Sequence, residues 1–439
     1  MLDLSNAIDL SSNAWVNAES RLQGHIVRHN GRDHVAMILF SIDPNKAPRQ
    51  GIGRLAASYV TSAERQRIQA RDRAENPWTL FGSLYLSACG YERLGFSRDE
   101  VEAAFHPDSH RQRNWFLDGM QQKLKDYPSA FPPRPPLPLT NYPGVGKERL
   151  DAMLLLAQDG DAPDCLDAAV AEAQDTIATF GTVLSIERGG IKRSNGLPVE
   201  PFGFADSIEM PTIIPPKTPN TPLVPPYTLL VPDPLANDPH AYGSHIIFMK
   251  LKQDVSGFNA AMECLAKKAN VPLDYAKAMV MGRFPNGTPL SNSPVPTTTT
   301  NTSVPDLFND LNGTKCPFHA HVRSVNPRFH PSGRSMSNPL FRRSVSYNQN
   351  GEEGLLFMAM QADIFASYGY VMMNWVNDPK FPVANSGTDA LIGSPSSAQS
   401  WPGARAGLGV DVNFDIGRHV QFQYGEFFFA PSIPFFQSL

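Results

Sequence analysis

The sequence lacks the features that mark several classes of protein. Its 439 residues include only four cysteines and no CxxC pair, so we expect neither a disulfide framework nor a structural zinc site. No run of about 18 apolar residues occurs, which excludes a transmembrane helix. The 38 Lys and Arg residues against 42 Asp and Glu leave a net charge of -4 and no basic stripe. We therefore expect neither nucleic acid nor a membrane as a partner.

The start of the chain carries no visible targeting signal. Its first twenty residues have neither a cationic n-region nor an apolar h-region, so no cleavable signal peptide is expected and a cytoplasmic location is predicted. Hydrophobic residues make up 41% of the chain and charged residues 18%, a balance that supports a buried core. The length exceeds the usual ~100–200 residues per domain. We expect two domains or one duplicated fold.

Proline is abundant and clustered. Of the 40 prolines, 18 lie in three irregular segments, at 131–144, 210–234 and 291–306. Proline fixes φ and removes a hydrogen-bond donor. The clusters therefore predict long surface insertions in a folded framework.

Between these insertions the hydrophobic pattern is mixed. Short apolar, β-branched or aromatic runs predict strands, and longer segments of helical period predict helices. Ser97 and Asp254 are placed as helix N-caps. The long alternation of strand and helix that is typical of a parallel sheet is absent, so an α+β fold is favoured. The predicted strands are 34–42, 180–187, 244–252 and 354–360, and the predicted helices are 60–75, 97–105, 161–177, 254–269 and 362–376.

Two segments hold candidate chemistry. In EPFGFADSIEMPTI (200–213), Asp206 follows a glycine turn among apolar residues. A carboxylate removed from water can work as a proton shuttle, although aspartate also commonly caps such turns.

The second segment, 315–348, is rich in histidine and arginine. An extended HAHVR would place His319, His321 and Arg323 on one face. Such a histidine pair suits zinc or a non-haem metal, yet no matching carboxylate accompanies it. A surface patch of histidine and arginine explains the same residues.

Taken together, these segments resemble the dye-decolorizing peroxidase family of haem enzymes. GFADSIEMP, CPFHAHVR with NPR, FRRSVSYN and GLLFMAMQADI occur in the family's order. They are similar to its GXXDG, CPxxAHxRxxNPR, RRGxxYG and GLLFxxxQxDI motifs. LQGHIVRHNGRDHVAMILF (22–40) and GEFFFAPSIPFFQSL (425–439) are similar to its terminal strands. The resemblance covers most of the chain, and the proline-rich loops match least.

The resemblance implies a fold. It predicts two ferredoxin-like α+β halves, each with an antiparallel sheet and peripheral helices, with haem bound in the C-terminal half. We place the domains at 1–195 and 196–439, so that the boundary precedes the Asp206 motif.

The resemblance also implies roles for individual residues. His321 matches the proximal ligand of the iron in haem b, and Asp389 matches the acidic residue that the family places near it. Asp206 and Arg342 match the distal aspartate and arginine. His319 occupies a position that varies in the family.

Further residues are expected around the haem. Leu355 and Phe357 match apolar residues of the distal wall. Arg323 and Arg328 suit the haem propionates, since guanidinium groups bind carboxylates well, but solvated surface arginines are an equal alternative.

The implied activity is a peroxidase cycle. Asp206 would move a proton between the oxygens of hydrogen peroxide, and Arg342 would stabilise the charge that develops as the O–O bond breaks. Bulky dyes and phenolic compounds would be the reducing substrates, and a homo-oligomer is possible. Because such dyes cannot enter a narrow pocket, Trp375 and Tyr347 are candidate surface relays for electrons, against ordinary core packing.

The chain departs from two of the motifs. Ser207 replaces the second glycine of GXXDG, Glu209 lies two residues further on, and Ser344 replaces the first glycine of RRGxxYG. Two other hypotheses therefore stay open. One is a haem carrier or storage protein on the same scaffold, and the other is a non-haem metalloprotein that uses His319 and His321.

Overall fold

The structure is a computed structural model of the whole chain. It describes thirteen stretches of the sequence, between which lie Ser207, Glu209 and parts of the proline-rich loops. The described residues are 1–72, 79–105, 114–133, 149–160, 164–194, 196–206, 208, 210–215, 222–298, 303–327, 338–394, 398–403 and 409–439.

The N-terminal half forms an antiparallel sheet with helices on its outer face. Its strand order is β2–β3–β1–β4, which is the 4-1-3-2 order of a ferredoxin-like β-α-β-β-α-β unit. Helices α2 and α8 supply the two crossovers. The elements are β1 (His34–Ile42), α2 (Pro48–Tyr59), β2 (Phe81–Leu86), β3 (Ala152–Gln158), α8 (Asp164–Ala178) and β4 (Gly181–Gly190).

The C-terminal half repeats this arrangement. Its order is β10–β11–β8–β14, again 4-1-3-2 when the four strands are counted along the chain. Helix α9 occupies the first crossover position, and the π-helices η7 and η8 occupy the second. The elements are β8 (Tyr242–Gln253), α9 (Val255–Ala269), β10 (Val345–Gln349), β11 (Glu352–Gln361), η7 (Phe365–Gly369), η8 (Met372–Val376) and β14 (Val420–Ala430).

The two halves close on each other. Gly190 of β4 pairs with Ser346 of β10, and Leu86 of β2 pairs with Phe429 of β14. The eight long strands therefore form a ring. One face of the strands points into the ring around a first apolar core, and the other face packs against helices in a second core. The predicted α+β fold with duplicated ferredoxin-like halves is confirmed. The boundary near residue 195 stays a prediction.

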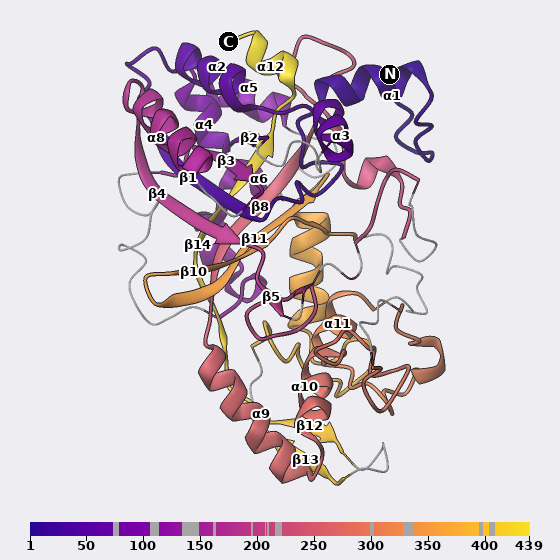
Figure 1. Ribbon diagram of the computed structural model, residues 1–439. Helices are drawn as coiled ribbons and strands as arrows, with labels where there is room; N and C mark the ends of the chain where they lie inside the picture. Colours follow the sequence, from indigo (N-terminus) through magenta and orange to yellow (C-terminus); the bar gives the residue numbers. More distant parts are fainter. Residues whose placement is uncertain are drawn as a thin grey trace.

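The remaining elements surround this ring. Figure 1 shows α2, α4, α5 and α8 at one end of the molecule, and α9 and α10 with the β12–β13 ribbon at the other. These further elements are α1 (Asn13–Arg21), α3 (Ala63–Arg71), α4 (Ala88–Arg93), α5 (Arg98–Ala104), α6 (Trp115–Asp118), α7 (Met120–Asp126), β5 (Arg193–Ser194), β6 (Leu197–Pro198), β7 (Val231–Pro232), α10 (Leu273–Met281), α11 (His321–Val325), β9 (Phe341–Arg342), β12 (Gln399–Pro402), β13 (Asp411–Phe414) and α12 (Ile433–Gln437).

The sequence patterns explain most of these elements. All four predicted strands are present, and each predicted helix contains helical structure. The side chain of Ser97 accepts a hydrogen bond from the N–H of Glu100, and that of Asp254 accepts one from the N–H of Gly257, so both predicted N-caps are confirmed.

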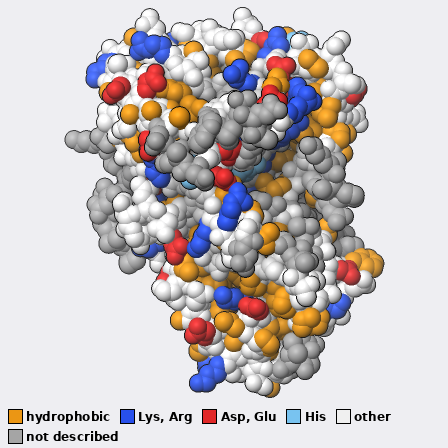
Figure 2. Space-filling model, in the orientation of Figure 1, with side chains coloured by type: hydrophobic (Ala, Val, Ile, Leu, Met, Phe, Trp, Pro, Cys, Tyr) orange, Lys and Arg blue, Asp and Glu red, His pale blue; other side chains and the backbone are white. Residues whose placement is uncertain are grey.

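The surface carries mixed charge on the face that Figure 2 shows, where Lys and Arg side chains are interspersed with Asp and Glu. Among the described helices, none has the length and apolar character needed to cross a bilayer.

Candidate functional site

A cavity of about 330 Å³ lies between the outer face of the C-terminal sheet and the helical segments that cover it. Six residues singled out from the sequence line this one cavity. They are Asp206, His321, Arg342, Leu355, Phe357 and Trp375. Residues that lie far apart in the sequence are thus brought to one cavity, while their roles stay predictions.

His321 is oriented by a carboxylate. It begins α11, and its Nδ1 lies 2.9 Å from Oδ2 of Asp389. Oδ1 of Asp389 accepts the N–H groups of Leu391 and Ile392, each at 2.9 Å. Burial raises the pKa of Asp389, but the contacts with His321 and these two N–H groups outweigh it and lower the pKa overall. Because an ionised carboxylate only accepts hydrogen bonds, a neutral His321 imidazole donates its Nδ1–H to Asp389, and Nε2 keeps a lone pair for a ligand.

Asp206 stands at the edge of the cavity on a short hairpin. Its N–H donates to the carbonyl of Pro198 at 3.0 Å, and Val199 and Ala205 form an antiparallel bridge. The N–H of Ala205 also donates to the carbonyl of Pro285, at 2.8 Å. Hydrogen bonds on both sides therefore fix the main chain that carries the Asp206 carboxylate.

Arg342 enters the cavity from β9, where it pairs with Ala359 of β11. The next residue, Arg343, is buried, and its guanidinium donates to the carbonyls of His25, Ile26 and Arg342 at 2.6, 2.7 and 2.9 Å. Burial lowers the pKa of Arg343 to about 10. Arg343 thus ties the N-terminal segment to the strand that presents Arg342.

Ser344, which replaces a motif glycine, lies between β9 and β10. Its Oγ accepts the N–H of Met358 at 3.2 Å. Ser207 and Glu209, the other two departures from the motifs, lie outside the described residues.

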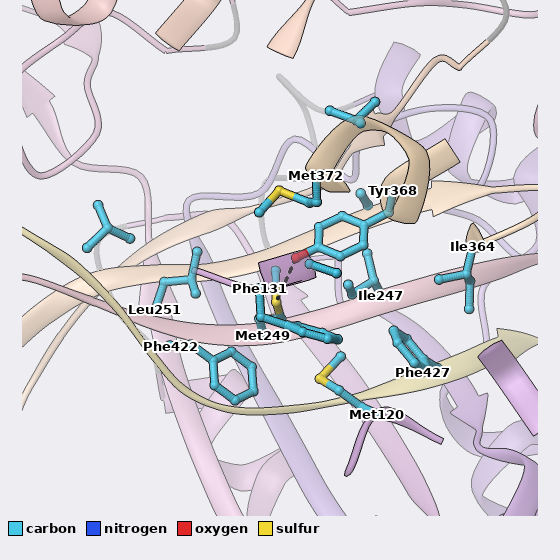
Figure 3. Packing of buried hydrophobic residues seen from close by; sticks show 14 of the residues in the cluster. Met120, Phe131, Ile247, Met249, Leu251, Ile364, Tyr368, Met372, Phe422 and Phe427 are labelled. Carbon is cyan, nitrogen blue, oxygen red and sulfur yellow. Dashed lines mark hydrogen bonds between the residues drawn. The ribbon is translucent and has the colours of Figure 1, made fainter. Parts of the chain in front are cut away.

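The apolar wall follows from strand alternation. Leu355 and Phe357 of β11 line the cavity, whereas Leu356 and Met358 point into the ring. Figure 3 shows the neighbouring part of this wall, where Tyr368 lies over the strand that carries Met249 and Leu251. The hydroxyl of Tyr368 is 3.6 Å from the sulfur of Met249. The cavity is therefore largely apolar, with charged groups at few places.

Arg323 does not line the cavity. Its guanidinium is buried and donates to Oδ2 and the carbonyl of Asp310 at 2.7 and 2.6 Å, and to the carbonyl of Cys316 at 2.7 Å. These contacts fix the loop that leads to His321, and they support neither predicted role, since the group is neither solvated nor in the cavity. Arg328 lies outside the described residues.

His319 points away from the cavity. The segment is helical from His321 onward, so the hypothesis of an extended HAHVR with a shared face is wrong. Nδ1 of His319 lies 3.1 Å from the carbonyl of Ser386, and its ring meets that of Trp401 edge-on at 4.6 Å. Burial lowers the pKa of His319 to about 4. In the described part of the chain, no group of three or more His, Cys, Asp or Glu is placed to hold a metal ion.

The two aromatic candidates for an electron relay are buried. Trp375 is 4% exposed, lines the cavity and stacks on Phe381. Tyr347 is 2% exposed and lies inside the ring, on the face of the sheet opposite the cavity. Neither side chain is a surface residue in this structure, so a dye outside the protein does not touch them.

The sequence analysis gave no role to two acidic or basic residues of the cavity. Glu200 and Arg283 both line the cavity. Arg283 is 6% exposed, and its guanidinium donates to the carbonyls of Gly287 and Ser303. Arg283 lies outside the segments singled out from the sequence, and Glu200 begins the 200–213 segment without a chemical pattern of its own.

Comparison with known proteins agrees with this geometry. No protein-family model matches the chain. The chain is 27% identical to the multifunctional dye peroxidase DyP2 of an Amycolatopsis species, over 98% of this chain and 100% of the relative. It is also 27% identical to the dye-decolorizing peroxidase msp1 of Mycetinis scorodonius, over 97% and 88%. Among solved structures, a DyP-type peroxidase of Anabaena superposes with a TM-score of 0.87 at 29% identity, covering 99% of this chain and 98% of that chain.

The resemblance to the dye-decolorizing peroxidase family is confirmed. The chain aligns with a dye peroxidase over almost its full length, and its fold agrees with that of a solved DyP-type peroxidase. The similarity extends across both ferredoxin-like halves.

Proposed function

We propose that this chain is a haem-dependent peroxidase of the dye-decolorizing type, which reduces hydrogen peroxide and oxidises bulky dyes and phenolic compounds. The observation that carries this proposal is the convergence of three groups on one cavity. They are the His321–Asp389 pair, the Asp206 carboxylate and the Arg342 guanidinium. A haem carrier or storage protein needs the His321–Asp389 pair to hold haem, but it does not need Asp206 or Arg342.

The cavity residues fit a haem in the C-terminal half. An imidazole whose Nδ1 is held by a carboxylate is a strong donor through Nε2, so His321 would hold the iron. The apolar walls at Leu355, Phe357 and Met249 suit the faces of a porphyrin such as haem b. When bound, the haem supplies the redox chemistry, and the protein supplies ligation, orientation and polarity.

Asp206 and Arg342 would then act on hydrogen peroxide. The Asp206 carboxylate takes a proton from one oxygen of hydrogen peroxide and returns it to the other oxygen, which leaves as water. The Arg342 cation stabilises the negative charge on the departing oxygen. Apolar side chains, among them Leu355 and Phe357, line the same cavity.

Reconstitution with haem b tests the proposal. The purified protein is titrated with haem, and its ultraviolet–visible spectrum is recorded before and after hydrogen peroxide is added. We expect a bound-haem spectrum that changes within the mixing time and returns as a dye or a substituted phenol is oxidised. Stoichiometric haem binding without peroxide-dependent oxidation would favour the carrier, and the absence of haem binding would overturn both readings. A cytoplasmic location and a homo-oligomer stay predictions.

A further inference from the structure

The hairpin that presents Asp206 is organised by a second acidic residue. Residues 200–204 form its tip, which reverses direction at Gly203 with a φ of 93°. The main chain closes the turn through two hydrogen bonds. The N–H of Glu200 donates to the carbonyl of Phe204 at 3.0 Å, and the N–H of Gly203 donates to the carbonyl of Glu200 at 2.9 Å.

The carboxylate of Glu200 folds back over its own turn. Oε2 accepts the N–H of Phe202 and Oε1 accepts the N–H of Phe204, both at 3.0 Å. Oε2 also accepts Nε2 of Gln253, from the end of β8, at 2.9 Å. One carboxylate thus fixes two N–H groups of the turn and attaches the turn to the sheet. A neutral amide at this position cannot do the same, because it has one acceptor atom and not two.

Aromatic packing holds the same turn from the other side. The ring of Phe202 stacks on Phe258 of α9 with centroids 4.2 Å apart, and the ring of Phe204 meets Phe258 at 6.3 Å. Asp206 follows Phe204 by two residues, so the turn sets where the Asp206 carboxylate points.

Glu200 is close enough to Asp206 for the two charges to interact. Removal from water raises the pKa of Glu200, hydrogen bonds from Gln253, Phe204 and Phe202 oppose this, and the charge of Asp206 raises it further. The Glu200 carboxylate accepts hydrogen bonds from Phe202, Phe204 and Gln253, although the residue lines the cavity. Its contacts suit support of the turn better than proton transfer.

We propose that Glu200 is a positioning residue for Asp206: its carboxylate holds the 200–204 turn in the conformation that aims residue 206 into the cavity. This inference rests on the proposed function, because the position of Asp206 matters only if Asp206 transfers a proton of hydrogen peroxide. A displacement of about 1 Å at a catalytic group can cost ~10²-fold in rate. Loss of the Glu200 contacts should therefore be visible in kinetics.

A double-mutant cycle on the haem-loaded protein tests the proposal. The variants are Glu200→Gln, Asp206→Asn and the double variant. Glu426→Gln is the matched control, since Glu426 is also a partly buried carboxylate that accepts two main-chain N–H groups, from Met120 and Phe427, but it does not line the cavity. The rate constant for reaction with hydrogen peroxide is measured by stopped flow, and kcat/KM is measured separately for peroxide and for the reducing substrate.

We expect Glu200→Gln to slow the peroxide reaction about 10-fold and Asp206→Asn about 10²-fold, with the double variant no slower than Asp206→Asn. The haem spectrum, kcat/KM for the reducing substrate and the Glu426→Gln control should be unchanged. Hydrogen exchange provides a readout that does not depend on activity. In Glu200→Gln, with or without haem, the amides of 198–206 should exchange at least about 10-fold faster, and those of β1 should not.

Three outcomes would overturn the positioning role. The first is wild-type peroxide reactivity in Glu200→Gln while Asp206→Asn is slow, which leaves the proposed function intact. The second is an additive loss in the double variant, because Glu200 would then act independently of Asp206. The third is an equal loss in Glu426→Gln, which would indicate a general effect of removing a buried carboxylate. Wild-type speed in Asp206→Asn would overturn both this inference and the role of Asp206 in the proposed function.

Discussion

Oδ2 of Asp389 lies 2.9 Å from Nδ1 of His321, and the aspartate side chain is 0% exposed while the imidazole is 22% exposed towards the cavity. The buried carboxylate is itself fixed by two main-chain N–H groups, so the direction of the imidazole is set by the fold. A histidine held in this way is prepared to bind a metal centre through its other nitrogen before that centre arrives.

The two histidines of HAHVR should therefore differ in their effect on haem binding. We expect His321→Ala to lose stoichiometric haem binding and His319→Ala to keep it, because only His321 lines the cavity. The His319 variant is a matched control in the same segment. Haem absorbance per protein, measured after removal of unbound haem, checks the prediction. Equal retention in both variants would contradict the assignment of His321.

Asp389→Asn should weaken haem binding without abolishing it. An amide does not provide a negative charge for the His321 imidazole, and loss of such a partner typically costs ~10–100-fold in affinity for a metal centre. Competition for haem with apomyoglobin measures the change. An affinity equal to that of the wild type would show that the aspartate is only a structural neighbour.

The two distal groups should affect the reaction with peroxide and not haem binding. We expect Asp206→Asn and Arg342→Leu each to slow that reaction by ~10²-fold or more, the usual scale for one acid–base or electrostatic group. Arg188→Leu is the control for Arg342, since its guanidinium pairs with Asp167 at 2.7 Å outside the cavity. Full speed in both distal variants would leave the mechanism without support.

Separated motifs in a fixed order restrict which residues meet, and on that basis the sequence singled out Asp206, His321 and Arg342, which line one cavity. The local structure around these residues was harder to predict. The partner of Arg323 could not be found in this way, because Asp310 lies 13 positions earlier in a loop that has no distinctive pattern. The short helix that begins at His321 was also missed, since five residues are too few to show a helical period.

The strands β2 and β3 were missed for a different reason. Every residue of β3, AMLLLAQ, is buried, because one face packs inside the ring and the other against helices. The alternation that identifies a half-buried strand is then lost, and a short apolar run does not distinguish a strand from a buried helix. The contacts of Glu200 could not be predicted either. The three groups that donate hydrogen bonds to its carboxylate meet only in the folded chain.

Arg323 should contribute to stability and not to haem affinity. Its buried ion pair with Asp310 spans 2.7 Å, and the two side chains are 7% and 0% exposed. We expect Arg323→Gln to lower the free energy of unfolding by about 3 kcal/mol, because a buried carboxylate loses its cationic partner. Chemical denaturation of the protein without haem checks this. Unchanged stability with weakened haem binding would instead support the predicted contact with a propionate.

Glu426 should make stability depend on pH. Burial raises its pKa from 4.5 to about 7, although the N–H groups of Met120 and Phe427 and the charge of Arg149 oppose the shift. Between these two values the folded protein holds a proton that the unfolded chain has released, so the free energy of unfolding falls as the pH rises through this window. Stability from this group is complete below pH 4.5 and lost above pH 7.

Glu426→Gln isolates that contribution. Oε1 of Glu426 accepts both N–H groups at 2.8 Å, so the amide oxygen of glutamine can keep both hydrogen bonds while the charge is removed. We expect the unfolding midpoint of the variant to fall less than that of the wild type between pH 5 and pH 8, a range that contains the Glu426 pKa of about 7. Differential scanning fluorimetry across this range measures both proteins. Parallel curves would mean that another group controls the pH dependence, of which Asp151, whose pKa burial raises to about 6, is the first to test.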